Sequence, residues 1–290
     1  MSSGWIILDK SSGVFSRTAG ARVARLFNTK KFGHIGTLDP MATGVLPIAL
    51  GNATKMIPFV SDANGGEKEY LFSLKFGIDT DTLDVTGNII SRNDIIPSDD
   101  QIRTAVNELI GDIMQVPPKY SAVHIDGARA YKMARNGADI KLPPRRMHIY
   151  NMQYNGFNGA SWNFSVRCSS GTYVRSLARD IAKKCGAIAS VDMIRRVYTT
   201  GFDIKNAVTL DFLENLYNNG ADIGKFLMPL DLGLGDIPVL NLSDKDTDFY
   251  KHGGFIKTAR PNGLVRVYNN DTFIGIGVVE NKQLRQKRTI

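Results

Sequence analysis

The sequence predicts a protein of the α+β class, in which strands and helices alternate irregularly and a further run of strands follows at the C-terminus. Some segments repeat apolar residues with the period of two that is typical of strands, and others with helical spacing. From about Gly233 onward, short strands replace the helical spacing. A length of 290 residues exceeds the usual size of one domain, so we expect a large domain with a small one attached.

The N-terminal residues predict a strand followed by a helix. Residues 5–8 (WIIL) form a short apolar run typical of a strand. A helix is predicted over residues 17–27, with Ser16 as its N-cap. Its apolar residues share one face and its arginines lie off that face: Ala19, Val23, Leu26 and Phe27 against Arg17, Arg22 and Arg25.

The middle of the chain predicts a strand with one buried face. Residues 70–76 (YLFSLKF) alternate with period two, and Tyr70 begins the inward set. A helix over residues 102–110 follows, with Ser98 and Asp99 as capping residues.

A second strand and helix carry polar side chains at their junction. Residues 162–168 (WNFSVRC) alternate as a strand, and the following helix has Val174, Leu177, Ala178 and Ile181 as its apolar residues. Tyr173 and Arg175 lie at the junction, where functional sites are commonly assembled. Arg175 and Arg179 also have the spacing of a solvated helix face, so the residues alone leave both interpretations open.

The C-terminal region predicts a compact β module. Strands are predicted over residues 239–242, 264–268 and 272–279, with a hairpin turn at residues 269–271. A module of about 50–60 residues is close to the lower limit for independent stability, so we expect it to dock on the main body.

The charge of the chain favours a polyanionic partner. The formal net charge is +8 and the pI is about 9.4. Lys and Arg are in excess over residues 1–60, 119–200 and 251–290, whereas Asp and Glu are in excess over the segments between them. Separate basic blocks suit a surface that binds nucleic-acid phosphates, although solvated faces would give the same composition.

Composition favours a water-soluble protein of the cytoplasm. Hydrophobic residues make up 43% of the chain, and no apolar run approaches the ~20 residues of a membrane span. The first residues lack the features of a secretory signal. Cys168 and Cys185 form no CxxC pattern, so we expect two reduced, buried thiols.

Several kinds of chemistry are excluded by their missing motifs. The histidines have no HxxxH or CxxC companions, so no zinc site is expected. Residues 79–84 (DTDTLD) resemble a calcium loop, but Asp84 and Ile90 stand where such a loop needs Gly and Glu. Neither GxxxxGK[ST] nor GxGxxG occurs. The sequence therefore predicts chemistry without a metal or cofactor.

Residues 33–48 (GHIGTLDPMATGVLPI) hold one carboxylate, Asp39, in a segment of restricted conformation. Gly36 and Gly44 allow backbone conformations that other residues rarely adopt, and Pro40 fixes φ. Asp-Pro pairs are also common in structural turns, so these residues alone leave a functional and a structural Asp39 equally open.

Residues 115–148 are bracketed by two Pro-Pro pairs and are predicted to project from the fold, with a basic helix near residues 128–135. Interleaved aromatic and basic residues suit stacking on RNA bases and neutralising phosphates, although a surface helix would look similar. The residues predicted to contact RNA, here and just before the Asp39 segment, are Lys30, Lys31, Lys119, Tyr120, Arg129, Tyr131, Lys132, Arg135, Arg145 and Arg146.

Four motifs in order along the chain resemble those of bacterial TruB-type tRNA pseudouridine synthases. Residues 33–48 resemble the family's catalytic-aspartate motif, and EKEY at residues 67–70 resembles its strand-borne tyrosine. Residues 116–137 (VPPKYSAVHIDGARAYKMARNG) resemble its RNA-gripping insertion, and residues 167–182 (RCSSGTYVRSLARDIA) its Tyr-x-Arg motif. The resemblance is nearly end to end.

The resemblance implies a pseudouridine synthase fold, with a mixed, mainly antiparallel sheet flanked by helices and a small C-terminal β-barrel of the PUA type. The catalytic domain would span residues 1–232, with its RNA-gripping insertion at about 117–147, and the PUA-like domain residues 233–290. The implied partner is tRNA, the implied state is a monomer, and neither a cofactor nor a metal is implied.

The resemblance further implies that uridine 55 in the T arm of tRNA is isomerised to pseudouridine after the base is flipped out. Asp39 would act as nucleophile or base, and Arg175 would keep it ionised, because a close guanidinium favours the carboxylate. Tyr70 would stack on the uracil, Tyr173 would line the pocket, and His34 would help to fill the space left by the base. Whether Asp39 attacks the sugar, adds to the base or abstracts a sugar proton stays open.

Two alternatives remain at this point. An RNA-binding or RNA-chaperone protein would use the Asp39 segment only as a structural turn. A pseudouridine synthase could also act on another RNA, as the relatives that work within guide-RNA particles do. The compact β module and the lack of a long basic tail favour the stand-alone type.

Overall fold

The computed structural model describes residues 2–62, 66–121, 123–125, 128–129, 133, 140 and 142–290, and it separates into two compact units. Unit 1 comprises Met1–Asp39, Val45–Gly66 and Thr200–Ile290, and unit 2 comprises Pro40–Gly44 and Glu67–Thr199. Asp39 is therefore the last residue of one stretch of unit 1, and Pro40 begins unit 2. The predicted domain boundary at residues 232/233 stays a prediction.

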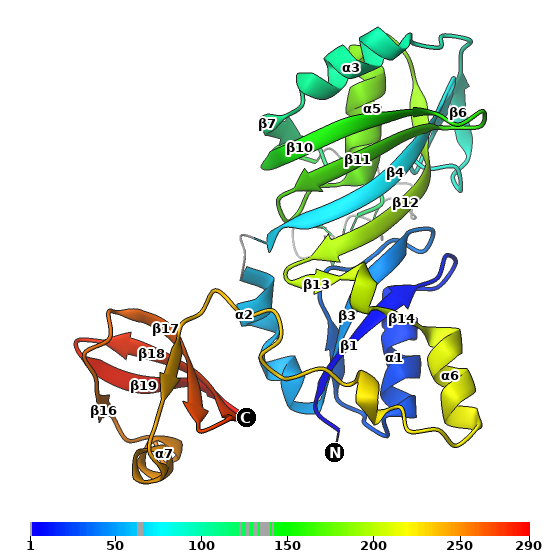
Figure 1. Cartoon of the computed structure of the whole chain (residues 1–290). Coiled ribbons are helices and arrows are strands. Elements are labelled where there is room, and N and C mark those ends of the chain that lie inside the picture. The colour runs from blue at the N-terminus through cyan, green and yellow to red at the C-terminus, as the bar shows by residue number, and fades with distance from the viewer. Residues whose placement is uncertain are drawn as a thin grey trace. The chain divides into compact units, whose positions relative to one another are not determined.

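Unit 1 combines the N-terminal elements with everything that follows residue 200 (Figure 1). Strand β14 is parallel to β1, β1 lies beside β3, and β2 is antiparallel to β3. Helices α1 and α6 contact each other, and α6 also contacts β1. Before the C-terminal sheet, the elements are β1 (Gly4–Lys10), α1 (Ser16–Leu26), β2 (Phe32–His34), β3 (Thr43–Leu50), the 3-10 turn η1 (Gly51–Lys55), α2 (Ile57–Asp62), β13 (Phe202–Asp203), η3 (Ile204–Asn206), β14 (Val208–Thr209), α6 (Leu210–Asn218) and η4 (Gly224–Phe226).

The C-terminal part of unit 1 is a curled five-stranded sheet in the order β15-β17-β18-β19-β16 (Figure 1). Its strands are β15 (Val239–Asn241), β16 (Ile256–Lys257), β17 (Gly263–Asn269), β18 (Thr272–Glu280) and β19 (Gln283–Thr289), and helix α7 (Asp244–Lys251) follows β15. The predicted β module is confirmed, including the hairpin between β17 and β18. The sequence did not predict β16 or β19.

The core of unit 1 includes residues from both of its ends. Trp5 is fully buried, lies 5.2 Å from the ring of Phe202, and donates its indole N–H to the carbonyl of Leu230. Phe273 and Ile276 of β18 belong to the same apolar cluster. The C-terminal sheet thus shares a core with the N-terminal strands, as expected for a module too small to be stable alone.

Unit 2 is built on an antiparallel sheet in the order β12-β4-β11-β10-β7, with α3 and α5 on one face (Figure 1). Together with unit 1, this confirms the prediction of a mixed, mainly antiparallel sheet flanked by helices. Its elements are β4 (Lys68–Phe76), β5 (Ile78–Thr80), β6 (Ile89–Arg92), α3 (Asp99–Asn107), β7 (Gly111–Gln115), β8 (His124–Ile125), β9 (Ala128–Arg129), β10 (Arg145–Phe157), β11 (Trp162–Cys168), α5 (Val174–Lys184) and β12 (Ala189–Thr199).

The predicted inward face of β4 is confirmed. Tyr70, Phe72, Leu74 and Phe76 are all buried, and Ser73 of the opposite face is buried as well. Phe72 stacks on Phe164 of β11, with ring centroids 5.1 Å apart. Period-two alternation gave this face because successive side chains of a strand point to opposite faces of the sheet.

Two local expectations were wrong, and one predicted helix was confirmed with shifted bounds. Ser16 does not cap α1, because its hydroxyl bonds the backbone of Leu38 instead. The helix predicted over residues 102–110 is confirmed as α3, with Ser98 as its cap in a capping box, although it begins at Asp99 and ends at Asn107. Ala128 and Arg129 form a short strand and not the start of a basic helix. Most of that predicted helix lies outside the described residues.

The first two residues of β3 belong to unit 2 and pair with β12 of the same unit. Thr43 and Gly44 pair in parallel with Arg195 and Arg196. Gly44 has φ +98°, and a Cβ at this position would lie 2.1 Å from the carbonyl oxygen of Arg196. Only glycine satisfies both the backbone conformation and this close approach.

We expect Gly44→Ala to lower the free energy of unfolding by about 2 kcal/mol more than Gly159→Ala, because of the added collision with β12. Gly159 is a matched control, since its φ is +90° and its Cβ would meet nothing within 4 Å. Urea denaturation of the two variants measures the difference. Equal losses would show that the approach of Arg196 is not a constraint.

Candidate functional site

The residues before Asp39 are anchored within unit 1. The hydroxyl of Ser16, buried at the start of α1, donates to the carbonyl of Leu38 at 2.9 Å and accepts from its N–H at 3.0 Å. The N–H of Ile35 donates to the carbonyl of Pro47, and Gly36 turns the chain at φ +64°. Asp39 itself is half-buried. The backbone that presents this carboxylate is therefore fixed by bonds from α1 and β3.

His34 lies within the same anchored segment. Its Nε2 and the hydroxyl of Thr37 are 3.0 Å apart. The imidazole is half-buried, and the role predicted for it, filling the space left by a flipped base, stays a prediction.

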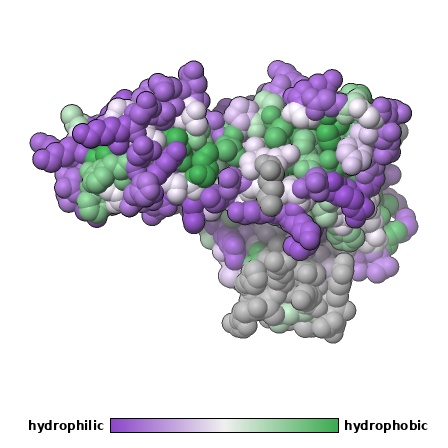
Figure 2. All heavy atoms as spheres, turned by 90° about the horizontal axis from the view of Figure 1, so that it is seen from below, coloured by the Kyte–Doolittle hydropathy of each residue, from purple (hydrophilic) through white to green (hydrophobic). Residues whose placement is uncertain are grey.

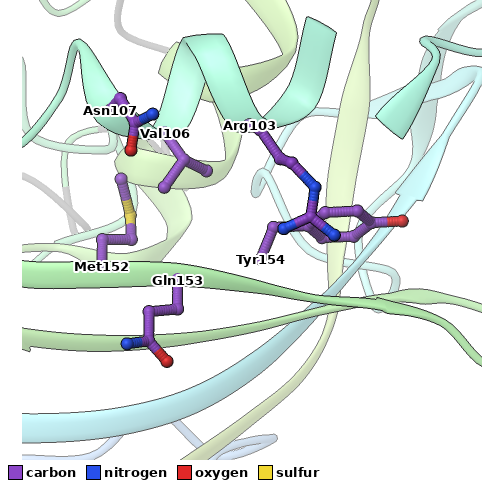
Figure 3. A pocket seen from close by; sticks show the side chains of 6 residues that line it. All are labelled: Arg103, Val106, Asn107, Met152, Gln153 and Tyr154. Carbon is purple, nitrogen blue, oxygen red and sulfur yellow. The ribbon is translucent and has the colours of Figure 1, made fainter. Parts of the chain in front are cut away.

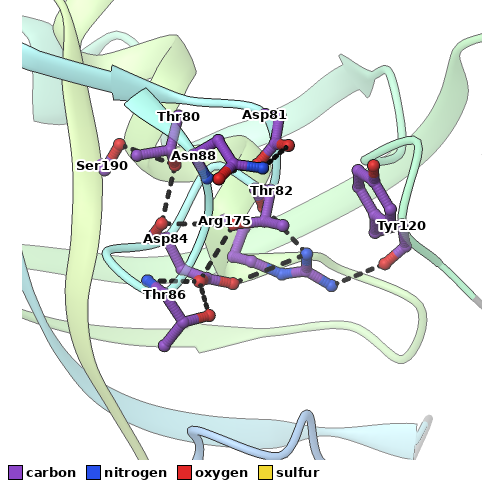
Figure 4. A network of polar contacts seen from close by, with 9 residues as sticks. All are labelled: Thr80, Asp81, Thr82, Asp84, Thr86, Asn88, Tyr120, Arg175 and Ser190. Atoms are coloured by element: carbon purple, nitrogen blue, oxygen red, sulfur yellow. Dashed lines mark hydrogen bonds and ion pairs between the residues drawn. The ribbon is translucent and has the colours of Figure 1, made fainter. Parts of the chain in front are cut away.

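Arg175 is buried in unit 2 at the beginning of α5 (Figure 4). Its guanidinium donates to the carbonyl of Thr82 and to the carbonyl of Tyr120, each at 2.9 Å. Its Nη1 also lies 3.8 Å from a carboxylate oxygen of Asp84. The interpretation of Arg175 as part of a solvated helix face is wrong, because the side chain is only 4% exposed.

Asp84 offsets the buried charge of Arg175 (Figure 4). A cation in the first turn of a helix is unfavourable, since the N-terminus is the positive end of the helix dipole. The Asp84 carboxylate accepts from the hydroxyl of Thr82 at 3.0 Å and from the N–H of Thr86 at 3.0 Å. Val191 of β12 pairs with Asp84 in an isolated bridge. The loop between β5 and β6 thus presents a fixed acid to α5.

Tyr173, the residue before α5, is held through its backbone. The side chain of Gln115, at the end of β7, accepts from its N–H at 2.8 Å and donates to its carbonyl at 3.2 Å. The half-buried Tyr173 side chain packs against an apolar cluster of Val123, Ile140 and Leu142. The two residues of the Tyr-x-Arg motif are therefore positioned independently, one by β7 and the other by the loop that carries Asp84.

Tyr70 lies near three side chains whose pKa values are shifted from their ordinary values. Arg196 of β12 is opposite Tyr70 in the sheet register, is 1% exposed, and forms a side-chain hydrogen bond with it. Burial lowers the pKa of Arg196, and Tyr70 opposes that change. Burial and the charge of Arg196 lower the pKa of Lys68, on the same strand, to about 8. Burial raises the pKa of the Cys168 thiol, opposite Lys68, to about 11.

Both cysteines are free, but the expectation of two buried thiols holds only for Cys168. Cys185 is half-buried.

The described residues among those predicted to contact RNA lie at the surface. Lys30, Lys31, Lys119, Arg145 and Arg146 are exposed, and Tyr120 is half-buried. Arg146 is paired with Asp112 at 2.8 Å. On the face shown in Figure 2, hydrophilic residues border hydrophobic patches. Tyr131, Lys132 and Arg135 lie outside the described residues, and of Arg129 only the backbone in β9 is described.

A cavity of about 280 Å³ between α3 and β10 contains none of the predicted site residues (Figure 3). The guanidinium of Arg103 lies over the ring of Tyr154, whose hydroxyl donates to Asp99 at 2.8 Å. The lining residues are Arg103, Val106, Asn107, Met152, Gln153 and Tyr154. This cavity therefore does not define the site.

In the part of the chain that the structure describes, no three His, Cys, Asp or Glu side chains are grouped to hold a metal ion. Among the same residues, no helix combines the length and the apolar character needed to cross a bilayer.

Sequence reasoning missed Asp84 and Arg196 as site residues. Asp84 was assigned only to a loop, and Arg196 was counted only as charge. The pairing predicted between Asp39 and Arg175 joins residues of different units and stays a prediction. Within unit 2, a carboxylate oxygen of Asp84 lies 3.8 Å from Arg175.

Comparisons with known proteins agree along the whole chain. A family model described as TruB family pseudouridylate synthase (N terminal domain) matches residues 24–174, and one described as Pseudouridine synthase II TruB, C-terminal, matches residues 238–290. The tRNA pseudouridine synthase B of Gluconacetobacter diazotrophicus is 40% identical over 99% of this chain and 97% of that protein. The protein of the same name from Ehrlichia chaffeensis is 38% identical over 98% of each chain.

Solved structures share the fold. The archaeal box H/ACA sRNP Nop10-Cbf5 complex contains a chain with a TM-score of 0.72 and 24% identity, covering 99% of this chain and 85% of that one. A chain of an H/ACA RNP bound to a substrate RNA containing 2'-deoxyuridine gives a TM-score of 0.70 at 23% identity, covering 95% of this chain and 77% of that one. Fold and family domains together define a pseudouridine synthase, an isomerase. This chain belongs to the TruB family of these enzymes.

We expect Asp84→Asn to lower the free energy of unfolding by about 3 kcal/mol, because Arg175 would stay buried without its carboxylate. Asp81→Asn is the matched control, since Asp81 lies in the same loop and bonds Asn88 instead of Arg175. Urea denaturation compares the two. A loss no larger than that of the control would mean that Asp84 does not stabilise the buried arginine.

We expect the contribution of Lys68 to the free energy of unfolding to become more favourable as the pH rises from about 7 to about 9. Its pKa is lowered from 10.5 to about 8 in the folded state, so above pH 8 the unfolded state binds more protons than the folded state. The free energy of unfolding of the wild type should therefore rise by about 1 kcal/mol relative to Lys68→Met over this range. A constant difference between the two proteins would contradict the lowered pKa.

Proposed function

We propose that this enzyme isomerises uridine 55 in the T arm of tRNA to pseudouridine, as a stand-alone protein that uses no guide RNA. The observation that carries the proposal is the similarity, at about 40% identity over nearly the full length, to proteins named tRNA pseudouridine synthase B. The reaction breaks the bond between N1 of uracil and the ribose and rejoins the base through C5. The proton on C5 leaves and N1 gains one, so no oxidant, reductant or cofactor is consumed.

Asp39 is proposed as the nucleophile or base. It is a half-buried carboxylate in a backbone anchored by Ser16 on one side and Gly44 on the other. A fixed carboxylate acts without reorganising at the moment of reaction, which favours catalysis. We propose that the guanidinium of Arg175 holds Asp39 in its ionised form, because a close opposite charge favours the carboxylate.

Tyr70 and Tyr173 are proposed to bind the flipped base. A T-arm uridine is stacked in the folded tRNA, so the enzyme must extrude it at a cost of a few kcal/mol. Stacking on an aromatic ring offsets part of that cost. Tyr70 is proposed to stack on the uracil, Tyr173 to line its pocket, and His34 to fill the vacated space.

The exposed basic residues are proposed to bind tRNA phosphates. Lys30 and Lys31 follow α1, and Lys119 precedes Tyr120, whose carbonyl bonds Arg175. Phosphate contacts fix the register of an RNA without reading its sequence.

We expect Asp39→Asn to lower the single-turnover rate of tritium release from [5-³H]uridine-labelled tRNA at least about 10²-fold, because the acid or base is removed. Filter binding should give a Kd for tRNA close to that of the wild type. Asp271→Asn, in the exposed turn after β17, is the control. An Asp39→Asn variant that releases tritium at the wild-type rate would disprove the proposal.

A guide-RNA-dependent activity is the second candidate, since the solved structures with the same fold include H/ACA particles. Purified enzyme and a tRNA transcript, with no other RNA or protein, distinguish the two. Pseudouridine at position 55 alone supports the stand-alone function, and no modification without added guide RNA contradicts it.

We expect replacing Lys30 and Lys31 together by Ala to weaken tRNA binding and to reduce the slope of log K against log salt by about 1–2. The single-turnover rate at saturating tRNA should not change, because both residues would contact phosphates only. Replacing Lys245 and Lys251 of the acidic helix α7 is the control. An unchanged slope would place the Lys30 and Lys31 side chains outside the RNA interface.

A further inference from the structure

Arg196 is a charged side chain with almost no access to water. It is 1% exposed, and Tyr70, opposite it on β4, is 7% exposed. Residues directly opposite each other in an antiparallel pair project to the same face of the sheet, about 5 Å apart at Cβ. A guanidinium in such a place is strongly unfavourable unless it is hydrogen-bonded, and one of its partners is the Tyr70 phenol.

The strand pairing is irregular just beyond this pair. Arg196 is opposite Tyr70, but Tyr198 is opposite Glu69, so Val197 is an extra residue on β12. Such a bulge bends the strand and changes the direction of the adjacent side chains. Bulges are over-represented next to active sites for this reason.

Lys68 and Cys168 lie near Tyr70 and Arg196 on this face. Lys68 precedes Tyr70 by two residues, and its pKa of about 8 leaves it partly neutral near physiological pH. The Cys168 thiol opposite Lys68 has a pKa of about 11 and is neutral. The Arg196 guanidinium lies beside the phenol on this face and is hydrogen-bonded to it.

The backbone of Arg196 packs against the start of β3. Its carbonyl oxygen occupies the space in which a Cβ of Gly44 would lie, 2.1 Å from that atom. Gly44 is five residues after Asp39 in the chain. One residue thus fixes the Tyr70 ring through its side chain and the segment after Asp39 through its backbone.

We propose that Arg196 is a positioning residue for Tyr70, which holds the phenol ring in the orientation needed to stack on the target uracil. This rests on the proposed function of Tyr70. The side chain acts through the Tyr70 oxygen and does not itself touch the reacting atoms.

The contact can be tested without activity. Tyrosine labelled with ¹³C at Cζ reports the hydrogen bonding of each phenol by NMR, and the Tyr70→Phe variant identifies the Tyr70 signal. We expect this signal to move in Arg196→Met and to stay in place in Arg266→Met, which removes a largely buried arginine paired with Asp231 in unit 1. A signal unmoved by Arg196→Met would overturn the proposal.

The role in the reaction is tested by a double-mutant cycle on single-turnover tritium release. Arg196→Met should lower the rate about 10-fold or more in the wild-type background and less than about threefold in Tyr70→Phe, because the phenol oxygen is then already absent. Arg196→Lys keeps a donor and should recover part of the rate. Kd for tRNA should change little in each variant.

The outcomes separate this proposal from the proposed function. Equal rate losses in the two backgrounds would show that Arg196 acts independently of Tyr70 and would overturn the positioning role. If Arg196→Met fails to fold, the same cycle is run with Arg196→Lys. A Tyr70 signal that does not move, or equal rate losses in the wild-type and Tyr70→Phe backgrounds, would then overturn the positioning role. If the wild type releases no tritium from tRNA, the proposed function is wrong, while the NMR shift still decides whether Arg196 holds Tyr70.

Discussion

The burial of two positive charges, the guanidinium groups of Arg175 and Arg196, is the constraint around which unit 2 is built. A buried charge that loses its partners destabilises a fold by several kcal/mol, so the partners must be held in place. Those of Arg175 come from the loop that carries Asp84 and from Tyr120, and a partner of Arg196 comes from β4. The bonds that offset these buried charges therefore also position Arg175 and Tyr70, the residues of unit 2 proposed to act in the site.

Local patterns in the sequence predicted the scaffold because burial in this fold is largely periodic. The alternation in β4 gave its inward face correctly, and helical spacing gave α1 and α5. Asp84 and Arg196 could not be recognised in this way, because charged residues are normally exposed and nothing local identifies a buried one. The partner of Asp84 lies 91 positions away, and that of Arg196 lies 126 positions away, so only the folded chain reveals either pair.

Two errors of local prediction have the same physical origin. Ser16 has the properties of an N-cap, yet its hydroxyl bonds the backbone N–H and carbonyl of Leu38. These backbone groups are buried, and leaving them unpaired would cost more free energy than leaving the end of the helix uncapped. Strand β19 was not predicted from the sequence, because its basic residues obscure the alternation of apolar and polar positions that is typical of a strand. Leu284 is its one fully buried position, and its neighbours in the sheet supply the hydrogen bonds that its sequence does not suggest. In both cases a tertiary contact outweighed a local preference.

The segment around Asp39, the proposed catalytic residue, is restricted at both of its ends. Leu38 is held by α1 in unit 1 and Gly44 by β12 in unit 2, so Asp39 lies between two anchors only six residues apart. Pro40 removes further freedom from that short span. A carboxylate on such a backbone has little conformational entropy left to lose when a substrate binds, which is the advantage of a preorganised group. The glycine that the close approach of Arg196 requires therefore also restricts the backbone that presents the proposed catalytic residue Asp39.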